Sequence, residues 1–239
     1  MSSEIVGEGT YGCVTNPSLA CKRPRNYTNK VSKVMKTADA RKEKNESKFL
    51  KTVPGIEKYA IAEPFLCQPK LDEVFHATVS KCKTEHVKKT YESRPDKLSL
   101  LLLENGGVNL NQFAKSIYPT LSNQEIKIFL HSLLELFNGV AFFNKNNIIH
   151  QDIKSDNIVY NIQTGAIKFI DFGLMIKKNQ FIQDSTANKN QLAQSWHYFP
   201  PEFSCSNRAA FNTLPKCSRY RDDYVGDYNA YIKDIADSF

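Results

Sequence analysis

The stretch IIHQDIKSDNIVY, residues 148–160, places several charged and amide side chains between two apolar pairs. It contains Asp152, Lys154 and Asn157, and a further carboxylate, Asp171, follows at the end of IKFID. Phosphoryl transfer needs a carboxylate that orients the attacking hydroxyl and accepts its proton, a cation beside the moving group, and oxygen ligands for magnesium. Asp152 suits the base and Lys154 the cation, while Asn157 and Asp171 suit the metal. This set of residues therefore predicts phosphoryl-transfer chemistry.

A second candidate site is the glycine-rich stretch GEGTYG, residues 7–12, which Val14 follows. The glycines Gly7, Gly9 and Gly12 let the backbone approach phosphate oxygens closely and present N–H groups to them. Glycines are also common in ordinary tight turns, so the pattern alone is weak. Its position between two strand-like segments favours a hairpin over a nucleotide rather than the strand-to-helix turn of a dinucleotide fold.

The elements that position these residues begin with short strands. EIVGEGTYGCV predicts strand–turn–strand, NKVSKVM predicts a strand, and LSLLLLE predicts a buried strand. The segment ADARKEKNESKFLKTV has helical composition and ends before Pro54. NGG, directly after LSLLLLE, predicts a hinge or turn.

The second half of the chain begins with a predicted long helix. Ser122 and Glu125 form a capping box. The apolar residues after it keep one face at helical spacing, and they are Ile126, Phe129, Leu130, Leu133, Phe137, Val140 and Ala141. NIVYN and AIKFIDF, joined by IQTG, predict a hairpin. Residues 173–199 are polar and predicted to be irregular.

The bulk composition predicts a globular protein of one large domain or two small lobes, since the chain has 239 residues, of which 41% are hydrophobic and 24% charged. We expect neither a membrane span nor secretion, because no apolar run approaches about 20 residues and the N-terminus lacks a signal-peptide pattern. The cysteines form no CxxC pair and are predicted to be free thiols in a reducing cytosol. They are Cys13, Cys21, Cys67, Cys82, Cys205 and Cys217.

The net charge of +7 is concentrated in residues 22–51, which hold 11 Lys and Arg against 3 Asp and Glu. Such a face suits nucleic acid or an acidic partner. Few aromatic residues are interleaved with the charges, so we interpret the face as a solvated surface and do not expect nucleic-acid binding.

Taken in order, the motifs GEGTYGCV, VSK, HQDIKSDN, DFG and PPE resemble those of eukaryotic-type protein kinases, and they span Gly7 to Glu202. The resemblance implies a two-lobed α+β fold with a small β-rich N-lobe at 1–103, a hinge at 104–108 and a mainly helical C-lobe at 109–239. It also implies that ATP and Mg²⁺ bind between the lobes. The compact motif spacing, and VSK after a Cys-containing strand, are similar to divergent kinases of large DNA viruses. A cytoplasmic location is therefore expected, in the host cytoplasm or the virion if the chain is viral.

The resemblance assigns roles to the charged residues of the N-lobe. Lys33 would hold the α- and β-phosphates, with Lys36 and Lys22 as alternatives. Glu46 would pair with Lys33 from the helix, with Glu43, one turn earlier, as the alternative.

The resemblance also implies a nucleotide site. The adenine would lie between Val14 and Val159, beside the gatekeeper Leu103. The hinge residues Glu104 to Gly106 would offer it backbone hydrogen bonds. The phosphate loop would comprise Gly7, Glu8, Gly9, Thr10, Tyr11 and Gly12.

The predicted substrate is a Ser or Thr hydroxyl of a protein. In Ser/Thr kinases a Lys stands two residues after the catalytic Asp, as Lys154 does after Asp152. Those kinases also keep a hydroxyl residue where SWHYFPPE has Ser195.

The regulation of this chain is predicted to differ from that of the family. Gln151 stands where the family has an Arg that grips a phosphate on the activation loop, and Gln cannot form a charged bidentate pair. We therefore expect catalysis without that switch. Ser185 and Thr186 are predicted to be exposed candidates for phosphorylation.

The end of the chain is short for the family. Only 37 residues follow Glu202, and the resemblance implies several later helices, one of which supplies an Arg partner for Glu202. KDIADSF resembles the start of a long buried helix anchored by Asp237 or Asp234. We expect either a truncated chain, which we favour, or a kinase completed by a partner.

Two alternative functions remain. Small-molecule phosphotransferases share His-x-Asp and a later metal-binding Asp, but they generally lack both the Lys of HQDIK and the PPE motif. A catalytically weak pseudokinase, acting as an ATP-binding scaffold, is disfavoured by the complete set of catalytic residue types and favoured by the missing helices.

Overall fold

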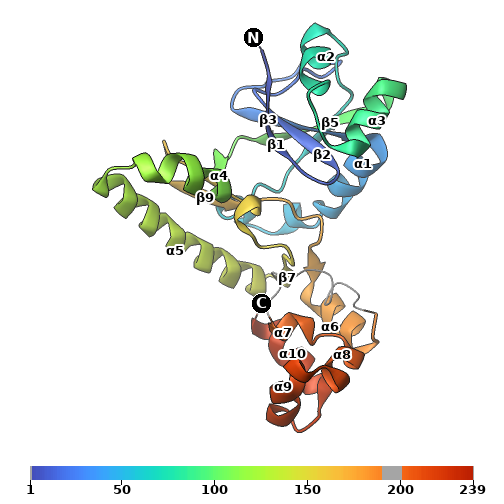
Figure 1. Ribbon diagram of the computed structural model, residues 1–239, viewed down its shortest axis with the longest axis vertical. Coiled ribbons are helices and arrows are strands. Elements are labelled where there is room, and N and C mark those ends of the chain that lie inside the picture. Colours follow the sequence, from blue (N-terminus) through green and yellow to red (C-terminus); the bar gives the residue numbers. More distant parts are fainter. Residues whose placement is uncertain (1, 190–200, 239) are drawn as a thin grey trace. The chain divides into compact units, whose positions relative to one another are not determined.

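The computed structural model describes residues 2–189 and 201–238, and its contacts divide the chain into two compact units (Figure 1). Unit 1 comprises Met1–Leu136 and Ile153–Gly173, and unit 2 comprises Phe137–Asp152 and Leu174–Phe239. This division differs from the predicted lobe boundaries at residues 103 and 109, which stay a prediction.

Unit 1 is built on a five-stranded antiparallel sheet with the strand order β1-β2-β3-β5-β4. The strands are β1 (Glu4–Glu8), β2 (Gly12–Asn16), β3 (Lys30–Lys36), β4 (Phe65–Cys67) and β5 (Leu98–Glu104). The predicted strand–turn–strand at the glycine-rich stretch, the strand at NKVSKVM and the buried strand at LSLLLLE are therefore confirmed.

Helices cover both faces of this sheet, which explains why LSLLLLE is apolar without alternation. Leu98, Leu100 and Leu102 pack with helices α2 (Glu73–Val79) and α3 (Glu85–Ser93). Leu101 points to the other face, because successive strand residues alternate. It packs there with Met35 and Ala40, the latter from helix α1 (Thr37–Glu46).

A second, three-stranded sheet in unit 1 has the order β6-β8-β9, from Val108–Asn109, Ile158–Asn161 and Ala166–Phe169. Strands β8 and β9 form the predicted hairpin. The sheet is joined to the earlier part of unit 1 by backbone hydrogen bonds, since Ile61 N–H donates to Phe169 O (3.0 Å) and Phe169 N–H to Tyr59 O (2.8 Å). These bonds explain why strands that follow residue 104 fold with unit 1.

Helix α4 (Leu110–Gln112) precedes the long helix α5 (Asn123–Lys145), whose capping box is confirmed. Ser122 N–H donates to Glu125 Oε2 (2.8 Å) and Glu125 N–H to Ser122 Oγ (3.4 Å). The Ser122 hydroxyl also donates to Glu125 Oε2 (2.6 Å), and this bond, together with the one from the Ser122 backbone N–H, lowers the pKa of the Glu125 carboxyl. The predicted apolar face is only partly covered, since Leu130 is 53% and Phe137 74% exposed.

By length and apolar composition, α5 is long enough to cross a membrane. Core helices of globular proteins meet the same criterion, so this is weak evidence for a membrane span. Single turns complete the connections at Leu50–Thr52, Ile56–Lys58, Pro95–Lys97, Phe113–Ile117, Tyr118–Thr120, Ser155–Asn157 and Pro215–Cys217.

Unit 2 pairs the short strands β7 (Ile148–Ile149) and β10 (Ile176–Lys177), and its described residues outside them are mainly helical. Its later helices are α6 (Lys178–Thr186), α7 (Pro201–Ser204), α8 (Arg208–Thr213), α9 (Ser218–Asp223) and α10 (Tyr228–Ser238). Their core gathers aromatic side chains, among them Phe181, Phe203, Phe211 and Tyr231.

The prediction that residues 173–199 are irregular is wrong over α6, which buries Phe181 against Phe203 at 5.7 Å between ring centroids. Ser185 is fully buried in this helix, and its carbonyl accepts a hydrogen bond from Tyr228. Thr186 donates its hydroxyl to Ile182 O (2.8 Å). Neither residue is the exposed modification site that the sequence predicts.

Glu202 has an arginine partner, contrary to the sequence-based expectation. Arg219 of α9 lies 3.1 Å from Glu202 Oε1, and the Tyr220 hydroxyl donates to the same oxygen at 2.8 Å. The hydrogen bond from the backbone of Glu202 itself, with those from Tyr220 and Arg219, lowers the pKa of the Glu202 carboxyl. The partner comes from the helix that directly follows α8, not from a later one.

All six cysteines are paired, so the prediction of free thiols is wrong. The disulfides join Cys13 to Cys82, Cys21 to Cys67 and Cys205 to Cys217. Disulfides are rare in a reducing cytosol, so the cytoplasmic location stays a prediction without support from the cysteines.

The NGG segment makes a close approach that only glycine permits. Gly107 has φ +94°, and a Cβ there would lie 2.1 Å from Tyr160 O. Gly165, in the β8–β9 turn, also has a positive φ (+69°), but a Cβ there would meet its nearest atom at 3.6 Å.

We therefore expect Gly107→Ala to lower the free energy of unfolding by more than Gly165→Ala. Both variants incur the cost of a positive φ, about 1 kcal/mol, but only Gly107→Ala forces a side chain onto a backbone carbonyl. Urea unfolding of the two variants measures the difference. Equal losses would contradict the close approach between Gly107 and β8.

The Glu202–Arg219 pair is expected to show a small favourable coupling in a double-mutant cycle of Glu202→Gln and Arg219→Ala, because both side chains are exposed to solvent. The folded-state pKa of Glu202 is lowered, so this coupling is present above the ordinary carboxyl range and is lost as the pH falls through the folded pKa. Urea unfolding at neutral and acid pH measures it. Lys216→Ala, which removes an exposed neighbouring cation, is the control, and a coupling independent of pH would contradict the ion pair.

Candidate active site

Lys33 lies in the middle strand of the sheet with its ammonium held between two carboxylates. Its Nζ is 2.8 Å from Glu43 Oε2 and 3.7 Å from Asp171 Oδ2, and its side chain is only 13% exposed. Burial alone lowers the pKa of this ammonium, but the two carboxylates outweigh it, so the pKa of Lys33 is raised. The side chain is therefore a fixed cation at neutral pH.

The predicted partner of Lys33, Glu46, lies one helical turn after the residue that forms the ion pair. Glu43, named as the alternative, forms the ion pair, whereas Glu46 lies 3.8 Å from Lys42. Ala40 is buried in α1, and an α-helix brings residues three or four apart to the same face. Glu43 is three residues after Ala40 and therefore faces the sheet.

Asp171 and Asn157 bring two oxygen donors into unit 1. Ile170 N–H donates to Asn157 O (2.9 Å), which ties the segment before Asp171 to the turn that carries Asn157. That turn begins at Lys154, whose carbonyl accepts from Asn157 N–H (2.9 Å). Asp171 has φ +59°, a left-handed conformation that costs a non-glycine residue about 1 kcal/mol or more. Strain of this kind is typical of functional sites.

An amide and a carboxylate oxygen are ligands that Mg²⁺ accepts, so the predicted metal pair fits that ion by donor type. Among the described residues, a different group, Glu8, Cys13 and Cys82, has ligand atoms close enough together to share a metal ion. The two sulfurs are joined in a disulfide, which leaves that cluster without thiolate ligands.

The glycines of GEGTYG have different structural roles. A Cβ on Gly12 would lie 2.7 Å from Val34 O, so Gly12 is required by the packing of β2 on β3. Gly7 and Gly9 have no such neighbour closer than 3.7 Å. Gly9 N–H donates to Gly12 O (2.9 Å), which closes the turn over Thr10 and Tyr11. Gly7 and Gly9 therefore leave the backbone open to a ligand.

The apolar residues predicted around the adenine belong to unit 1. Val14 pairs with Lys33 across β2 and β3, and Leu103 pairs with Val31 across β3 and β5. Val31 is two residues before Lys33, so these side chains share one face of the sheet. Sequence reasoning missed Val31, although its position two residues before Lys33 was a usable signal.

The predicted floor of the adenine site, Val159 in β8, is buried and lies against the hinge. A Cβ on Gly106 would be 2.4 Å from Val159 Cγ2 and 2.6 Å from Ile61 Cδ1. Ile61 was also missed, and no motif surrounds it in the sequence. Glu104, at the end of β5, is paired through its side chain with Lys168 of β9 at 3.4 Å.

The predicted base, Asp152, belongs to unit 2 and is buried beside His150. Asp152 N–H donates to His150 Nδ1 at 3.3 Å. Gln151 between them has φ +61°, so the chain turns sharply at the residue that replaces the family's Arg. Asp152 is covalently followed by Ile153–Gly173, the segment of unit 1 that carries Lys154, Asn157 and Asp171. Ser195, predicted to face the catalytic Asp, lies outside the described residues.

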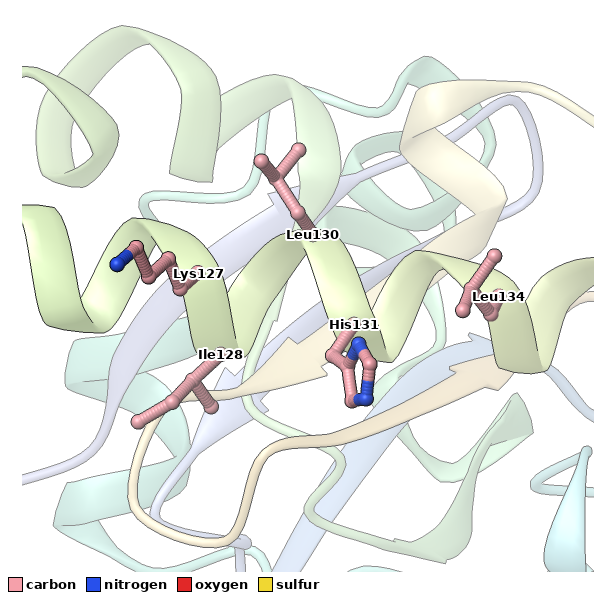
Figure 2. A pocket seen from close by; sticks show the side chains of 5 residues that line it. All are labelled: Lys127, Ile128, Leu130, His131 and Leu134. Carbon is pink, nitrogen blue, oxygen red and sulfur yellow. The ribbon is translucent and has the colours of Figure 1, made fainter.

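A shallow hollow on helix α5 is not part of this site. Figure 2 shows Lys127, Ile128, Leu130, His131 and Leu134 along successive turns of that one helix. It contains none of the residues predicted for catalysis or nucleotide binding.

Known proteins with similar sequences include several that are named as protein kinases. The chain is 30% identical over 76 residues to human mitogen-activated protein kinase kinase kinase 6, covering 32% of this chain and 6% of that protein. It is 35% identical over 94 residues to the serine/threonine-protein kinase pakH of Dictyostelium discoideum, covering 39% of this chain and 17% of that protein. A probable serine/threonine-protein kinase, cdc7, of the same organism is 38% identical over 60 residues, covering 25% and 5%. The chain thus spans less than a fifth of the length of these relatives.

The family model for the protein kinase domain matches residues 1–212, which include the glycine-rich loop, Lys33, the segment 150–157 and Asp171. Because this match covers most of the chain, the chain belongs to the protein kinase domain family.

Proposed function

We propose that this kinase domain transfers the γ-phosphate of ATP to Ser or Thr hydroxyls of protein substrates. The observation that carries the proposal is the buried Lys33 ammonium between Glu43 and Asp171. A buried cation is stable only with such partners, and a partly exposed carboxylate beside it suits a phosphate and its metal. Phosphoryl transfer depends mainly on positioned charge of this kind.

The nucleotide is proposed to lie against the sheet face that carries Val14, Val31 and Lys33. The absence of side chains at Gly7 and Gly9 lets its phosphates approach the backbone of the loop closely, and Lys33 binds the α- and β-phosphates as a point charge. The backbone of Glu104 to Gly106 offers hydrogen bonds to the adenine edge, and Leu103 limits the space beside it.

Asn157 and Asp171 are the residues that would hold Mg²⁺. When bound, the metal neutralises negative charge on the phosphates. Asp171 is paired with Lys33, and the backbone hydrogen bond from Ile170 to Asn157 links the two segments that carry these donors.

The proposed chemical step uses Asp152. Its carboxylate orients the substrate hydroxyl and accepts the proton, while the hydroxyl oxygen bonds to the γ-phosphorus. The bond from that phosphorus to the β–γ bridging oxygen breaks, and ADP leaves. Lys154 supplies a second cation for the transferred group.

Serine or threonine specificity is supported by Lys154, two residues after Asp152, and by the names of two relatives, pakH and cdc7, as a serine/threonine-protein kinase and a probable one. Gln151 supports regulation without an arginine-anchored phosphate on the activation segment, and burial of Ser185 is consistent with that proposal.

Asp152→Ala and Lys33→Met are expected to lower phosphate transfer by about 100-fold or more, because they remove the base and the phosphate cation. The measurement is transfer of labelled γ-phosphate from Mg·ATP to a generic protein substrate. Mg·ATP binding is expected to survive Asp152→Ala. Binding without transfer in the unaltered protein would favour an ATP-binding scaffold, and transfer only to small molecules would favour the phosphotransferase alternative.

Glu43→Gln and Glu46→Gln form a matched pair within one helix. Glu43→Gln is expected to lower kcat/KM about tenfold, because it removes the charged hydrogen bond that orients Lys33. Glu46→Gln is expected to stay within about twofold, since its carboxylate pairs with the exposed Lys42 and not with Lys33. Steady-state kinetics with varied Mg·ATP compares them, and a larger loss in Glu46→Gln would show that the ion pair of the structure is not the functional one.

A further inference from the structure

The connection between β4 and β5, residues 68–97, contains helices α2 and α3 and lies beside the glycine-rich loop. Three successive residues at its centre contact that loop. Cys82 is bonded to Cys13, Lys83 N–H donates to Glu8 Oε1 (2.6 Å), and the Thr84 hydroxyl donates to Gly9 O (3.0 Å). We call residues 82–84 the loop clamp.

The loop clamp is itself firmly anchored in the core of unit 1. Thr84 is only 8% exposed, and its carbonyl accepts the first backbone hydrogen bonds of α3, from Val87 and Lys88. Val87 is fully buried, and it packs with Phe75 of α2. The clamp is therefore held in place by the packing of the helices that precede and follow it.

The clamp holds the loop from the side of the sheet opposite Lys33. Glu8 pairs with Cys13 across β1 and β2, whereas Gly7 pairs with Val14. Side chains alternate along a strand, so Glu8 and Cys13 face the α2–α3 layer, and Val14 faces the side of Lys33. The contacts at Glu8 and Cys13 therefore leave the proposed nucleotide face of the hairpin open.

A further contact lies at the tip of the loop. The ring of Tyr11 stacks on His86 of α3, with 5.9 Å between centroids and 22° between planes. Together, these contacts hold the hairpin at Glu8, Gly9, Tyr11 and Cys13, on both sides of its turn.

We propose that the loop clamp sets the position of the phosphate-binding loop and that Thr84 and Glu8 are positioning residues for the nucleotide, an inference that rests on the proposed function. Glycine-rich segments lose much conformational entropy when they become ordered. A loop that is ordered before the nucleotide arrives avoids that loss at binding. The clamp therefore increases affinity for Mg·ATP and leaves the chemical step unchanged.

The first test uses Thr84→Val, which keeps the side-chain shape and removes the hydroxyl, and Thr84→Ser, which keeps the hydroxyl. Loss of one hydrogen bond is expected to raise the Kd and the KM for Mg·ATP about three- to tenfold, with kcat within about twofold. Thr84→Ser is expected to keep the Kd and the KM for Mg·ATP close to those of the unaltered protein. A kcat that falls while KM is unchanged would overturn the proposal.

The second test compares two disulfides of the same unit. The double variant Cys13→Ser/Cys82→Ser opens the clamp, and Cys21→Ser/Cys67→Ser removes a disulfide from the same hydrophobic cluster but away from the loop. Both are expected to lower the melting temperature. Only the first is expected to weaken Mg·ATP binding, and equal effects of the two on the Kd would overturn the proposal.

Hydrogen exchange of the loop amides, residues 7–13, without nucleotide separates this inference from the proposed function. Faster exchange in Thr84→Val than in Thr84→Ser supports the clamp, and equal exchange overturns it. If the loop amides respond as expected but the unaltered protein fails to bind Mg·ATP, the proposed function fails, and the nucleotide-positioning role fails with it.

Discussion

The Lys33 ammonium is the interaction on which unit 1 depends. It is a charge placed in a strand between Ser32 and Val34, both of which are buried, and it is stable there only because Glu43 and Asp171 approach it. Removing water from a charge is costly, and removing one partner of a buried pair leaves that cost uncompensated. The positions of α1 and of the segment after β9 are thus coupled to one side chain of β3.

This constraint explains why the sheet has two different faces. The face with Leu98, Leu100 and Leu102 is covered by α2 and α3 and is mainly apolar, and the buried hydroxyls of Thr15 and Ser32 on it are hydrogen-bonded to each other (2.6 Å). The opposite face combines a small apolar cluster, formed by Met35, Ala40 and Leu101, with the charged group at Lys33. One layer thus supplies the hydrophobic stabilisation, and the other carries the polar residues of the candidate site.

Much of this arrangement was predictable from local patterns. Apolar strand patterns and turn residues locate β1, β2, β3, β5 and the β8–β9 hairpin. The spacing of the polar residues around Asp152 predicts phosphoryl-transfer chemistry. Which side of α1 faces the sheet was not predictable, because Glu43 and Glu46 have similar neighbours in the sequence. The packing of Ala40 against Leu101 turns Glu43, and not Glu46, toward Lys33. Helix α6 was missed because its buried residues, Phe181 and Ser185, stand among polar ones. Arg219 and the disulfides depend on contacts distant in sequence, for which a single chain contains no local signal.

The two disulfides of unit 1 are nested, since Cys21–Cys67 closes 46 residues inside the 69 residues that Cys13–Cys82 closes. Once the inner bond exists, the outer cysteines are separated from it by only 8 and 15 residues. Loop-closure entropy grows with the logarithm of loop length, so the inner bond lowers the cost of the outer one by about 1 kcal/mol. This saving is mutual, so the disulfide that anchors the edge strand β4 and the disulfide that closes the loop clamp on the glycine-rich hairpin stabilise each other.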